Sequence, residues 1–414
     1  MKSPVWHPFT QHGLGERIPL IAHAEGAVLH SSDGKRIVDA ISSWWVTTHG
    51  HRHPRIMQAI RDQTEQLDQI IFAGWTHEPA ERLAAELLDL MPAGLAYVFF
   101  SDSGSTSVEV ALKMALGYWR NRGEPRHRIL TLEHGYHGDT IGCMSVGARG
   151  VFNAAYAALL FDVEVVPFPW EGSEQETIDA LGKLCRAGDI AAFIVEPLIL
   201  GAGGMRIYSA ETLRELRRIC AEARVLFIAD EVMTGWGRTG TLLACEQARI
   251  VPDLLCLSKG LTGGSLPLAV TLASPAIYEA HFSDDRSMQF FHSSSYTANP
   301  LACAAALGNL SVWREEPVRA RIAALEQKQQ ERAKRLNGAS NVRQLGTIVA
   351  CELERGGSDY LSPSVPARLA RFRDRNVLLR PLGSTVYVMP PYCIGNEELD
   401  LVYDAIEEAV ADAR

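Results

Sequence analysis

Short runs of apolar residues, each ending in polar or small residues, recur along the central part of the chain. Residues 225–229 (VLFIA) and 254–257 (LLCL) are uninterrupted apolar runs. Runs of this length predict strands that are buried on both faces of a parallel sheet. The segment that begins at Ser209 instead places Leu213, Leu216, Ile219 and Cys220 on one stripe, which predicts an amphipathic helix. Strand and helix in alternation predict an α/β fold.

Further apolar runs predict the other strands of the same sheet, at 97–100, 129–132, 163–166 and 191–195. Near the start of the chain, residues 27–30 and 36–41 predict a hairpin, because Ser32–Gly34 between them has the composition of a turn. Toward the end we predict, in chain order, a strand over 342–353, a helix over 367–375, a hairpin of 377–380 with 385–389, and a helix over 397–413.

The chain has 414 residues, more than one ordinary hydrophobic core needs. We therefore expect a large α/β domain over 46–304 with a mostly parallel central sheet, and a small α+β domain formed by 1–45 and 305–414. The composition, 47% hydrophobic and 21% charged, is typical of a soluble globular protein. A net charge of -9 argues against nucleic acid or an anionic membrane as a partner.

The eight cysteines are scattered along the chain without any CxxC spacing, and several of them lie in apolar runs. This distribution is typical of reduced cysteines in a cytoplasmic protein. We find no signal-peptide pattern in the first thirty residues and no apolar stretch long enough to span a bilayer.

Two charged residues follow the two central strands. Asp230 comes directly after one apolar run, and Lys259 comes two residues after the other. Carboxyl ends of neighbouring parallel strands meet at one edge of a sheet, where open α/β folds bind ligands. An acid and a lysine at this edge suit pyridoxal phosphate, whose aldehyde condenses with a lysine and whose ring nitrogen is kept protonated by a carboxylate. The alternative is a turn-capping acid and a solvated lysine, which Gly260 and Gly263 beside the lysine disfavour.

The segment SDSGSTS at 101–107 lies between a predicted strand and a predicted helix. Small residues at a helix amino end leave backbone N–H groups free to bind an anion, although ordinary capping by serine is the alternative. The adjacent Trp44 and Trp45 point to opposite sides of an extended or looped segment, so one can lie in the core while the other lines a pocket.

The segment EHGYHGDT at 133–140 holds two histidines that resemble metal ligands, but its glycines predict a loop instead. On this loop Tyr136 can stack on a ring, and Asp139 is a candidate hydrogen-bond partner for it. The tract HGHRH at 49–53 lacks a carboxylate or cysteine partner, so we expect no metal site there.

Two motifs, ADEVMTGWGRTG at 229–240 and PDLLCLSKGLTGG at 252–264, resemble the signature of the class III, fold-type I aminotransferases. The resemblance implies pyridoxal 5'-phosphate as cofactor and a homodimer with shared active sites. It implies that Lys259, Asp230 and Tyr136 are catalytic. It further implies the residues that bind the cofactor: Gly104, Ser105, Tyr136, Asp230, Lys259, Ser294 and Ser295, the serines reaching the partner subunit's cofactor phosphate.

Within this class, the chain is similar from Trp6 to Tyr392 to members of the biotin pathway. These members convert 8-amino-7-oxononanoate to 7,8-diaminononanoate with S-adenosylmethionine as amino donor. The resemblance implies that Arg380 holds the carboxylate of the acceptor. The substrate-binding residues that it implies are Phe9, Trp44, Tyr136, Lys259, Ser293, Arg380 and Tyr387. We expect Tyr392 to line the same pocket.

The chain departs from the family pattern at two places. Phe9 stands where many adenosylmethionine-using members have tyrosine, and Ser293–Ser295 stands where the family often has Gly-Pro-Thr. Lysine as the donor therefore remains an alternative, as does an ω-amino acid:pyruvate or 4-aminobutyrate aminotransferase. An aminomutase would use the same lysine and acid, and a regulatory protein that binds the cofactor without catalysis is a further alternative.

Overall fold

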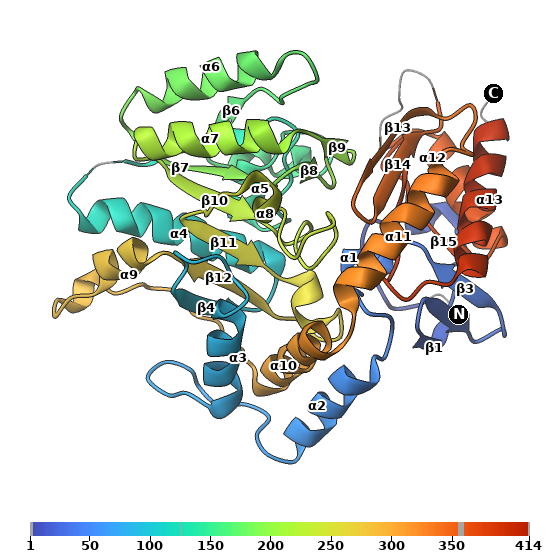
Figure 1. Ribbon diagram of the computed structural model, residues 1–414, viewed down its shortest axis with the longest axis horizontal. Coiled ribbons are helices and arrows are strands. Elements are labelled where there is room, and N and C mark those ends of the chain that lie inside the picture. Colours follow the sequence, from blue (N-terminus) through green and yellow to red (C-terminus); the bar gives the residue numbers. More distant parts are fainter. Residues whose placement is uncertain (1–2, 125, 355–359, 413–414) are drawn as a thin grey trace.

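The computed structural model consists of two parts that lie side by side (Figure 1) and describes residues 3–124, 126–354 and 360–412. We call the part that contains α2 (Pro54–Thr64) through α10 (Pro300–Glu315) the large part. The small part contains the strands near the amino end and the described residues from α11 (Val318–Ala333) onward. Segments from both ends of the chain therefore pack together in the small part.

A seven-stranded sheet, in the order β4-β12-β11-β10-β7-β5-β6, forms the centre of the large part. Its strands are β4 (Tyr97–Ser101), β5 (Arg128–Leu132), β6 (Glu164–Val166), β7 (Ile190–Val195), β10 (Leu226–Asp230), β11 (Leu254–Leu257) and β12 (Ala269–Ala273). The six strands predicted from apolar runs are confirmed. The predicted mostly parallel arrangement is also confirmed, since only β12 runs antiparallel to its neighbours.

Alternate residues of the central strands face different helices, because successive side chains of a strand point to opposite faces. Phe193 and Phe227 pack in a hydrophobic cluster with side chains of α6 (Glu174–Cys185) and α7 (Ala210–Glu222). Ile194 and Ile228 pack in the cluster of α4 (Gly104–Asn121) on the other face. Both faces are covered, which explains why these strands are apolar throughout.

Further helices of the large part are α3 (Glu78–Leu88), α5 (Ile141–Val146), α8 (Cys245–Ala248) and α9 (Pro275–His281). The helix predicted to begin at Ser209 is confirmed as α7, with Ser209 as its N-cap. Between the two parts lie α1 (Ser42–Trp45) and the short hairpin of β8 (Ile199–Leu200) with β9 (Arg206–Ile207). Among the described residues, no helix is long and apolar enough to cross a membrane.

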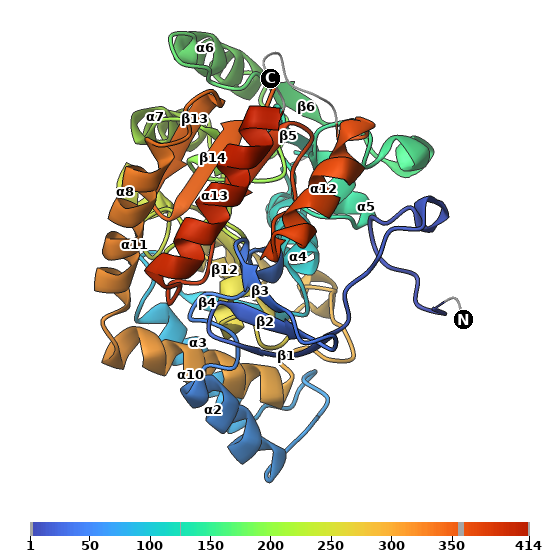
Figure 2. The ribbon, with the colours of Figure 1, turned by 90° about the vertical axis from the view of Figure 1, so that its right-hand side faces the viewer.

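The small part contains two sheets, and Figure 2 shows helices α11, α12 (Ser364–Asp374) and α13 (Asn396–Asp412) lying over them. One sheet has the order β1-β2-β3-β15 and the other β13-β14-β16. These strands are β1 (Ile21–Glu25), β2 (Val28–Ser31), β3 (Arg36–Asp39), β13 (Ser340–Leu345), β14 (Ile348–Glu352), β15 (Val377–Leu378) and β16 (Thr385–Val388). The predicted hairpin at 27–41 is confirmed, and its turn contains Gly34 at φ 84°.

Two predictions for the small part are wrong. The single strand over 342–353 is a hairpin of β13 and β14, because Gly346 turns the chain at φ 54°. The hairpin of 377–380 with 385–389 does not form, because β15 pairs with β3 and β16 pairs with β14. Pairing with strands far away in sequence overrides the local pattern here. The predicted helix over 397–413 corresponds to α13, but its last residue lies outside the described residues.

We expect Ile228→Ala to destabilise the protein, because Ile228 is completely buried in the central strand β10. Truncation of a buried isoleucine leaves a cavity and lowers the free energy of unfolding by about 2–5 kcal/mol. Denaturant unfolding followed by circular dichroism measures the change. Val165→Ala is the control, because Val165 is 52% exposed on the edge strand β6. Equal destabilisation by the two changes would contradict the assigned core.

Candidate active site

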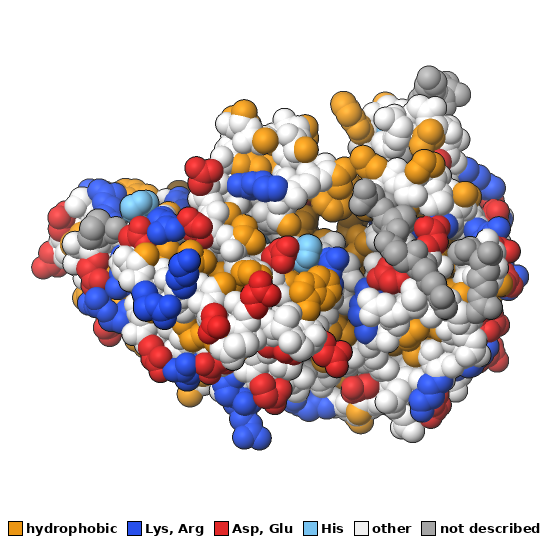
Figure 3. All heavy atoms as spheres, turned by 90° about the horizontal axis from the view of Figure 1, so that it is seen from above, with side chains coloured by type: hydrophobic (Ala, Val, Ile, Leu, Met, Phe, Trp, Pro, Cys, Tyr) orange, Lys and Arg blue, Asp and Glu red, His pale blue; other side chains and the backbone are white. Residues whose placement is uncertain are grey.

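A cavity of about 460 Å³ lies at the carboxyl ends of the parallel strands, where the large and small parts meet. Figure 3 shows this region as a hollow between the two parts in which hydrophobic side chains gather. Among the residues that line it are Phe9, Trp44, Trp45, Gly104, Ser105, Tyr136, His137, Glu196, Asp230, Lys259, Arg380 and Tyr387. The cavity thus brings together the site residues named from the sequence, apart from the three serines and Tyr392.

Lys259 begins the short 3₁₀ turn Lys259–Thr262, which follows β11. Its backbone has a φ of 46°, a conformation that residues other than glycine rarely adopt. Its Nζ atom lies 4.5 Å from the centre of the Trp45 ring. Burial lowers the pKa of Lys259 to about 8, although Asp230 and Glu196 favour the charged form. A substantial fraction of the amine is therefore neutral near pH 8, the state in which nitrogen is a nucleophile or a base.

Asp230 is the last residue of β10 and is buried at the wall of the cavity. Its Oδ2 atom lies 2.7 Å from Nδ1 of His137, and its Oδ1 atom accepts a hydrogen bond of 3.1 Å from the backbone of Val232. The sequence indicates no role for His137, because the pattern of its loop does not reveal that the ring faces a strand end far away in the chain. With His137 donating through Nδ1, the carboxylate is oriented to hold a proton on a ligand nitrogen.

Tyr136 and Glu196 connect two loops at the cavity. The Tyr136 hydroxyl donates a hydrogen bond of 3.0 Å to Asp139, as the sequence suggested, and its backbone N–H donates to Glu196 at 3.0 Å. Glu196 also accepts a hydrogen bond of 2.9 Å from Gly201. Burial raises the pKa of Glu196 to about 7 and raises the pKa of the Tyr136 hydroxyl above its usual range. Glu196 therefore both lines the cavity and fixes the loop that carries Tyr136.

The amino end of α4 points at the cavity through Gly104 and Ser105. Ser103 caps the helix and forms a capping box with Thr106, so capping and anion binding are both available to this segment. A Cβ atom at Gly138 would lie 2.0 Å from Oγ of Ser105, so only glycine fits there. The free N–H groups and the dipole of α4 make this end of the cavity suitable for a phosphate.

The two adjacent tryptophans both line the cavity. The sequence predicted one of them in the core and the other at a pocket, but Trp45 does both. It is buried, and its Nε1 donates a hydrogen bond of 3.0 Å to the hydroxyl of Tyr387. Trp44 is 41% exposed and packs against Phe9, with ring centres 5.5 Å apart. Phe9 and Trp44 thus form an apolar wall.

Arg380 extends from the end of β15 to this apolar wall. Its guanidinium donates hydrogen bonds of 3.1 Å to the carbonyl of Phe9 and 3.0 Å to the hydroxyl of Tyr360. It also lies 5.2 Å from the centre of the Trp44 ring. These contacts are all to neutral groups, so the guanidinium retains the capacity to bind a carboxylate.

The three serines with predicted roles do not line the cavity of their own chain. Ser294 donates a hydrogen bond of 2.5 Å to Asp102, and Ser293 donates to the Ser294 carbonyl at 3.1 Å. The carbonyl of Ser295 accepts a bond of 2.6 Å from Gln69. Tyr392, which the sequence placed in the pocket, also lies elsewhere. Its hydroxyl donates a hydrogen bond of 2.5 Å to the carbonyl of Trp236.

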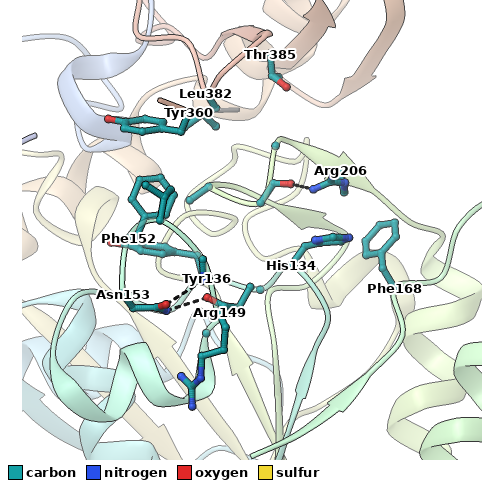
Figure 4. A pocket seen from close by; sticks show the side chains of 18 of the residues that line it. His134, Tyr136, Arg149, Phe152, Asn153, Phe168, Arg206, Tyr360, Leu382 and Thr385 are labelled. Carbon is teal, nitrogen blue, oxygen red and sulfur yellow. Dashed lines mark hydrogen bonds between the residues drawn. The ribbon is translucent and has the colours of Figure 1, made fainter. Parts of the chain in front are cut away.

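A second cavity of about 1200 Å³ adjoins the first, and the sequence did not predict it. Tyr136, Phe152 and Tyr360 line both cavities. Figure 4 shows Tyr360 and Leu382, from the small part, above Phe152, with His134 and Arg206 farther along the wall. The rings of Tyr360 and Phe152 are in contact, with their centres 4.8 Å apart. The two cavities are therefore adjacent, and we call the second one the outer chamber.

The residues of the first cavity fit pyridoxal 5'-phosphate. The amine of Lys259 suits the aldehyde, the carboxylate of Asp230 suits the ring nitrogen, and the amino end of α4 suits the phosphate. Tyr136 also lines this cavity and offers a flat ring on which the pyridine ring can stack.

Comparison with known proteins agrees with this fit. The chain is 47% identical to adenosylmethionine-8-amino-7-oxononanoate aminotransferase of Synechococcus elongatus, over 98% of this chain and 97% of the relative. A crystal structure of the enzyme of that name from Methanocaldococcus jannaschii superposes with a TM-score of 0.94 at 32% identity, covering 99% of this chain and 97% of the other.

A PLP-bound amine transaminase from an uncultivated Pseudomonas species superposes with a TM-score of 0.93 at 31% identity over the full length of both chains. The model of the family "Aminotransferase class-III" matches residues 12–410. The fold is therefore that of the fold-type I transaminases. The chain belongs to the class III aminotransferases, which depend on pyridoxal 5'-phosphate.

Proposed function

We propose that the protein transfers an amino group from S-adenosylmethionine to 8-amino-7-oxononanoate and forms 7,8-diaminononanoate in biotin biosynthesis. The position of Arg380 carries this proposal. Its guanidinium lies at an apolar wall in the same cavity as Lys259 and is not neutralised by the groups it contacts. The acceptor has matching chemistry, because a methylene chain separates its carboxylate from its keto group. The 47% identity to a relative of that name supports the same assignment.

Bound pyridoxal phosphate supplies an electron-withdrawing ring that stabilises negative charge on the reacting carbon. We propose that the Nζ atom of Lys259 moves the proton to and from that carbon as general base and acid. Asp230 holds the proton on the ring nitrogen, and His137 orients Asp230. Gly104 and Ser105 bind the phosphate, and Tyr136 stacks on the ring.

The amino donor and the keto-acid acceptor react in turn, in two half-reactions that share one cavity. The two substrates need different amounts of space. A volume of about 460 Å³ lies toward the lower end of the roughly 300–1,000 Å³ typical of a site for one drug-sized ligand. Cofactor and acceptor together use much of this space, and the nucleoside of S-adenosylmethionine needs more. We propose that the donor extends past Tyr360 and Phe152 into the outer chamber. Lysine, the alternative donor, would not need that chamber.

We further propose a homodimer in which Ser293, Ser294 and Ser295 act at the partner subunit's site. Their position outside the cavity of their own chain supports this proposal. The aromatic residues around them also support it, since Phe291 is 62% and Tyr296 is 63% exposed. Large aromatic side chains at this exposure are typical of interfaces. All eight cysteines are free, in keeping with a reducing compartment, and we place the reaction in the cytoplasm.

The donor is tested by the two half-reactions, each followed through the absorbance of the bound cofactor. We expect S-adenosylmethionine to convert the cofactor in a single turnover, and lysine to do so at least about a hundredfold more slowly, which corresponds to roughly 3 kcal/mol of transition-state binding. The original spectrum should return with 8-amino-7-oxononanoate and not with pyruvate. A fast response to lysine alone would overturn the proposed donor, and return of the original spectrum with pyruvate or another small keto acid would overturn the proposed acceptor.

We expect Arg380→Met to weaken the apparent binding of the keto-acid acceptor and raise its KM by about 10–100-fold, because a hydrogen bond to a charged group contributes about 1.5–3 kcal/mol. The kcat should change less, since the carboxylate stays bound throughout the reaction. The KM of Arg380→Lys should lie between those of the unchanged protein and Arg380→Met, because an ammonium binds a carboxylate less specifically than a guanidinium. Arg375→Met serves as the control, since Arg375 pairs with Glu408 on the surface. An unchanged KM in Arg380→Met would contradict this assignment.

The lowered pKa of Lys259 predicts its reactivity in the cofactor-free protein. An amine with a pKa of about 8 is protonated below that pH and nucleophilic above it. The labelling rate of Lys259 by an acylating reagent should therefore reach half its maximum near pH 8. Peptide mass spectrometry measures it, with the exposed Lys35 as reference in the same sample. If Lys259 and Lys35 shared one pH profile, the amine could not be shielded from water as described.

A further inference from the structure

Asn309 is a completely buried amide on α10, directly behind the turn that carries Lys259. Its Nδ2 group donates hydrogen bonds of 3.1 Å to the carbonyl of Gly260 and 3.0 Å to the carbonyl of Leu261. These are the second and third residues of the turn Lys259–Thr262. One side chain from a helix distant in sequence thus holds two of the carbonyl groups that follow the lysine.

The turn requires such support, because its conformation is unfavourable by itself. Lys259 lies in the left-handed region at φ 46°, and Gly263 ends the turn at φ 63°. A residue other than glycine persists in this region only where its surroundings enforce it. The flanks of the turn are held by Ser258, whose hydroxyl donates to the Leu268 carbonyl, and by Thr262, whose hydroxyl donates to the Leu266 carbonyl. The middle of the turn is held by Asn309.

His49 is a buried neighbour of Asn309. The ring of His49 is buried among Trp313, His53 and Tyr392. Burial lowers the pKa of His49 to about 3, while the nearby Asn309 side chain favours the charged form. Within the described residues, neither ring nitrogen of His49 has a hydrogen-bond partner, and Oδ1 of Asn309 is likewise buried without one. The hydrogen bonds of the Asn309 amide are therefore those of Nδ2, and both of them go to the turn.

We propose that Asn309 is a positioning residue for Lys259, which fixes the lysine turn through two backbone carbonyls. The proposal rests on the proposed role of Lys259 as the lysine that binds the cofactor. A side chain inside α10 then contributes to the reaction, although Asn309 itself does not line the cavity. If the carbonyls are released, the turn can relax toward an ordinary φ and carry Nζ away from the cavity wall, and water can enter beside the amine.

Asn309→Asp tests the hydrogen bonds at nearly constant volume, because a carboxyl group has the shape of the amide but donates one hydrogen bond when protonated and none when ionised, so it cannot hold both carbonyls. We expect the cofactor to bind at least about tenfold more weakly and kcat to fall by a similar or larger factor. In the cofactor-free protein, the pH at which labelling of Lys259 is half-maximal should move upward from about 8 toward the ordinary value of lysine. Asn309→Ala should change all three quantities in the same directions.

Gln329→Glu is the matched control. Gln329 is also a completely buried amide whose Nε2 donates to a backbone carbonyl, that of Thr347, but it lies in the small part and does not touch the turn. We expect it to lower the thermal midpoint as much as Asn309→Asp does and to leave cofactor affinity and the Lys259 labelling profile unchanged. Tyr403→Phe removes the hydrogen bond that Gln329 accepts and replaces this control if Gln329→Glu does not fold.

The outcomes separate the positioning role from the proposed function. Unchanged labelling profile and cofactor affinity in both Asn309 variants, or equal changes in Gln329→Glu, would overturn the positioning role. A shifted labelling profile in a protein that shows no amino transfer from S-adenosylmethionine would overturn the proposed substrates and leave the positioning role standing.

Discussion

The amine of Lys259, held largely out of water in the cavity between the two parts, is the feature on which the rest of the site depends. Burial favours its neutral form, whereas the nearby Asp230 and Glu196 favour its charged form. The resulting pKa of about 8 lies close to neutrality because these effects partly offset each other. Removal of the carboxylates would leave the amine neutral and without electrostatic support. Opening of the cavity to water would leave it protonated and unreactive.

The buried carboxylates around this lysine are kept stable in different ways. Asp230 receives a hydrogen bond from His137, whereas Glu196 receives two from backbone N–H groups. Glu231 follows Asp230 in sequence but points to the other side of the strand end, where the backbone N–H groups of Ala244 and Cys245 bind it. Neighbours in sequence thus have separate tasks. Asp230 lines the cavity, whereas Glu231 anchors the loop after β10. Burial raises the pKa of Glu231 to about 7.

The sequence predicts those features that are encoded locally. The strand ends at Asp230 and Lys259 could be predicted because an uninterrupted apolar run stops just before each of them. His137 could not, because its partner Asp230 is 93 residues away and no local pattern shows that they meet. The pairing of β15 with β3 and the two hydrogen bonds of Asn309 depend in the same way on how distant segments pack. The resemblance to a family identified Arg380, but only the structure shows that the groups around it are neutral.

The cavity exists only because the two parts are held together, and Arg238 has a central place in that contact. It is fully buried, and its guanidinium donates to the carbonyls of Trp45, Thr47 and Pro390. These carbonyls belong to the segment beside Lys259 and to the small part. Backbone carbonyls bind the two terminal nitrogens of the guanidinium without cancelling its charge, as a carboxylate would. That charge still acts on Lys259 and favours its neutral amine. The contact that closes the cavity therefore also adjusts the reactivity of the lysine inside it.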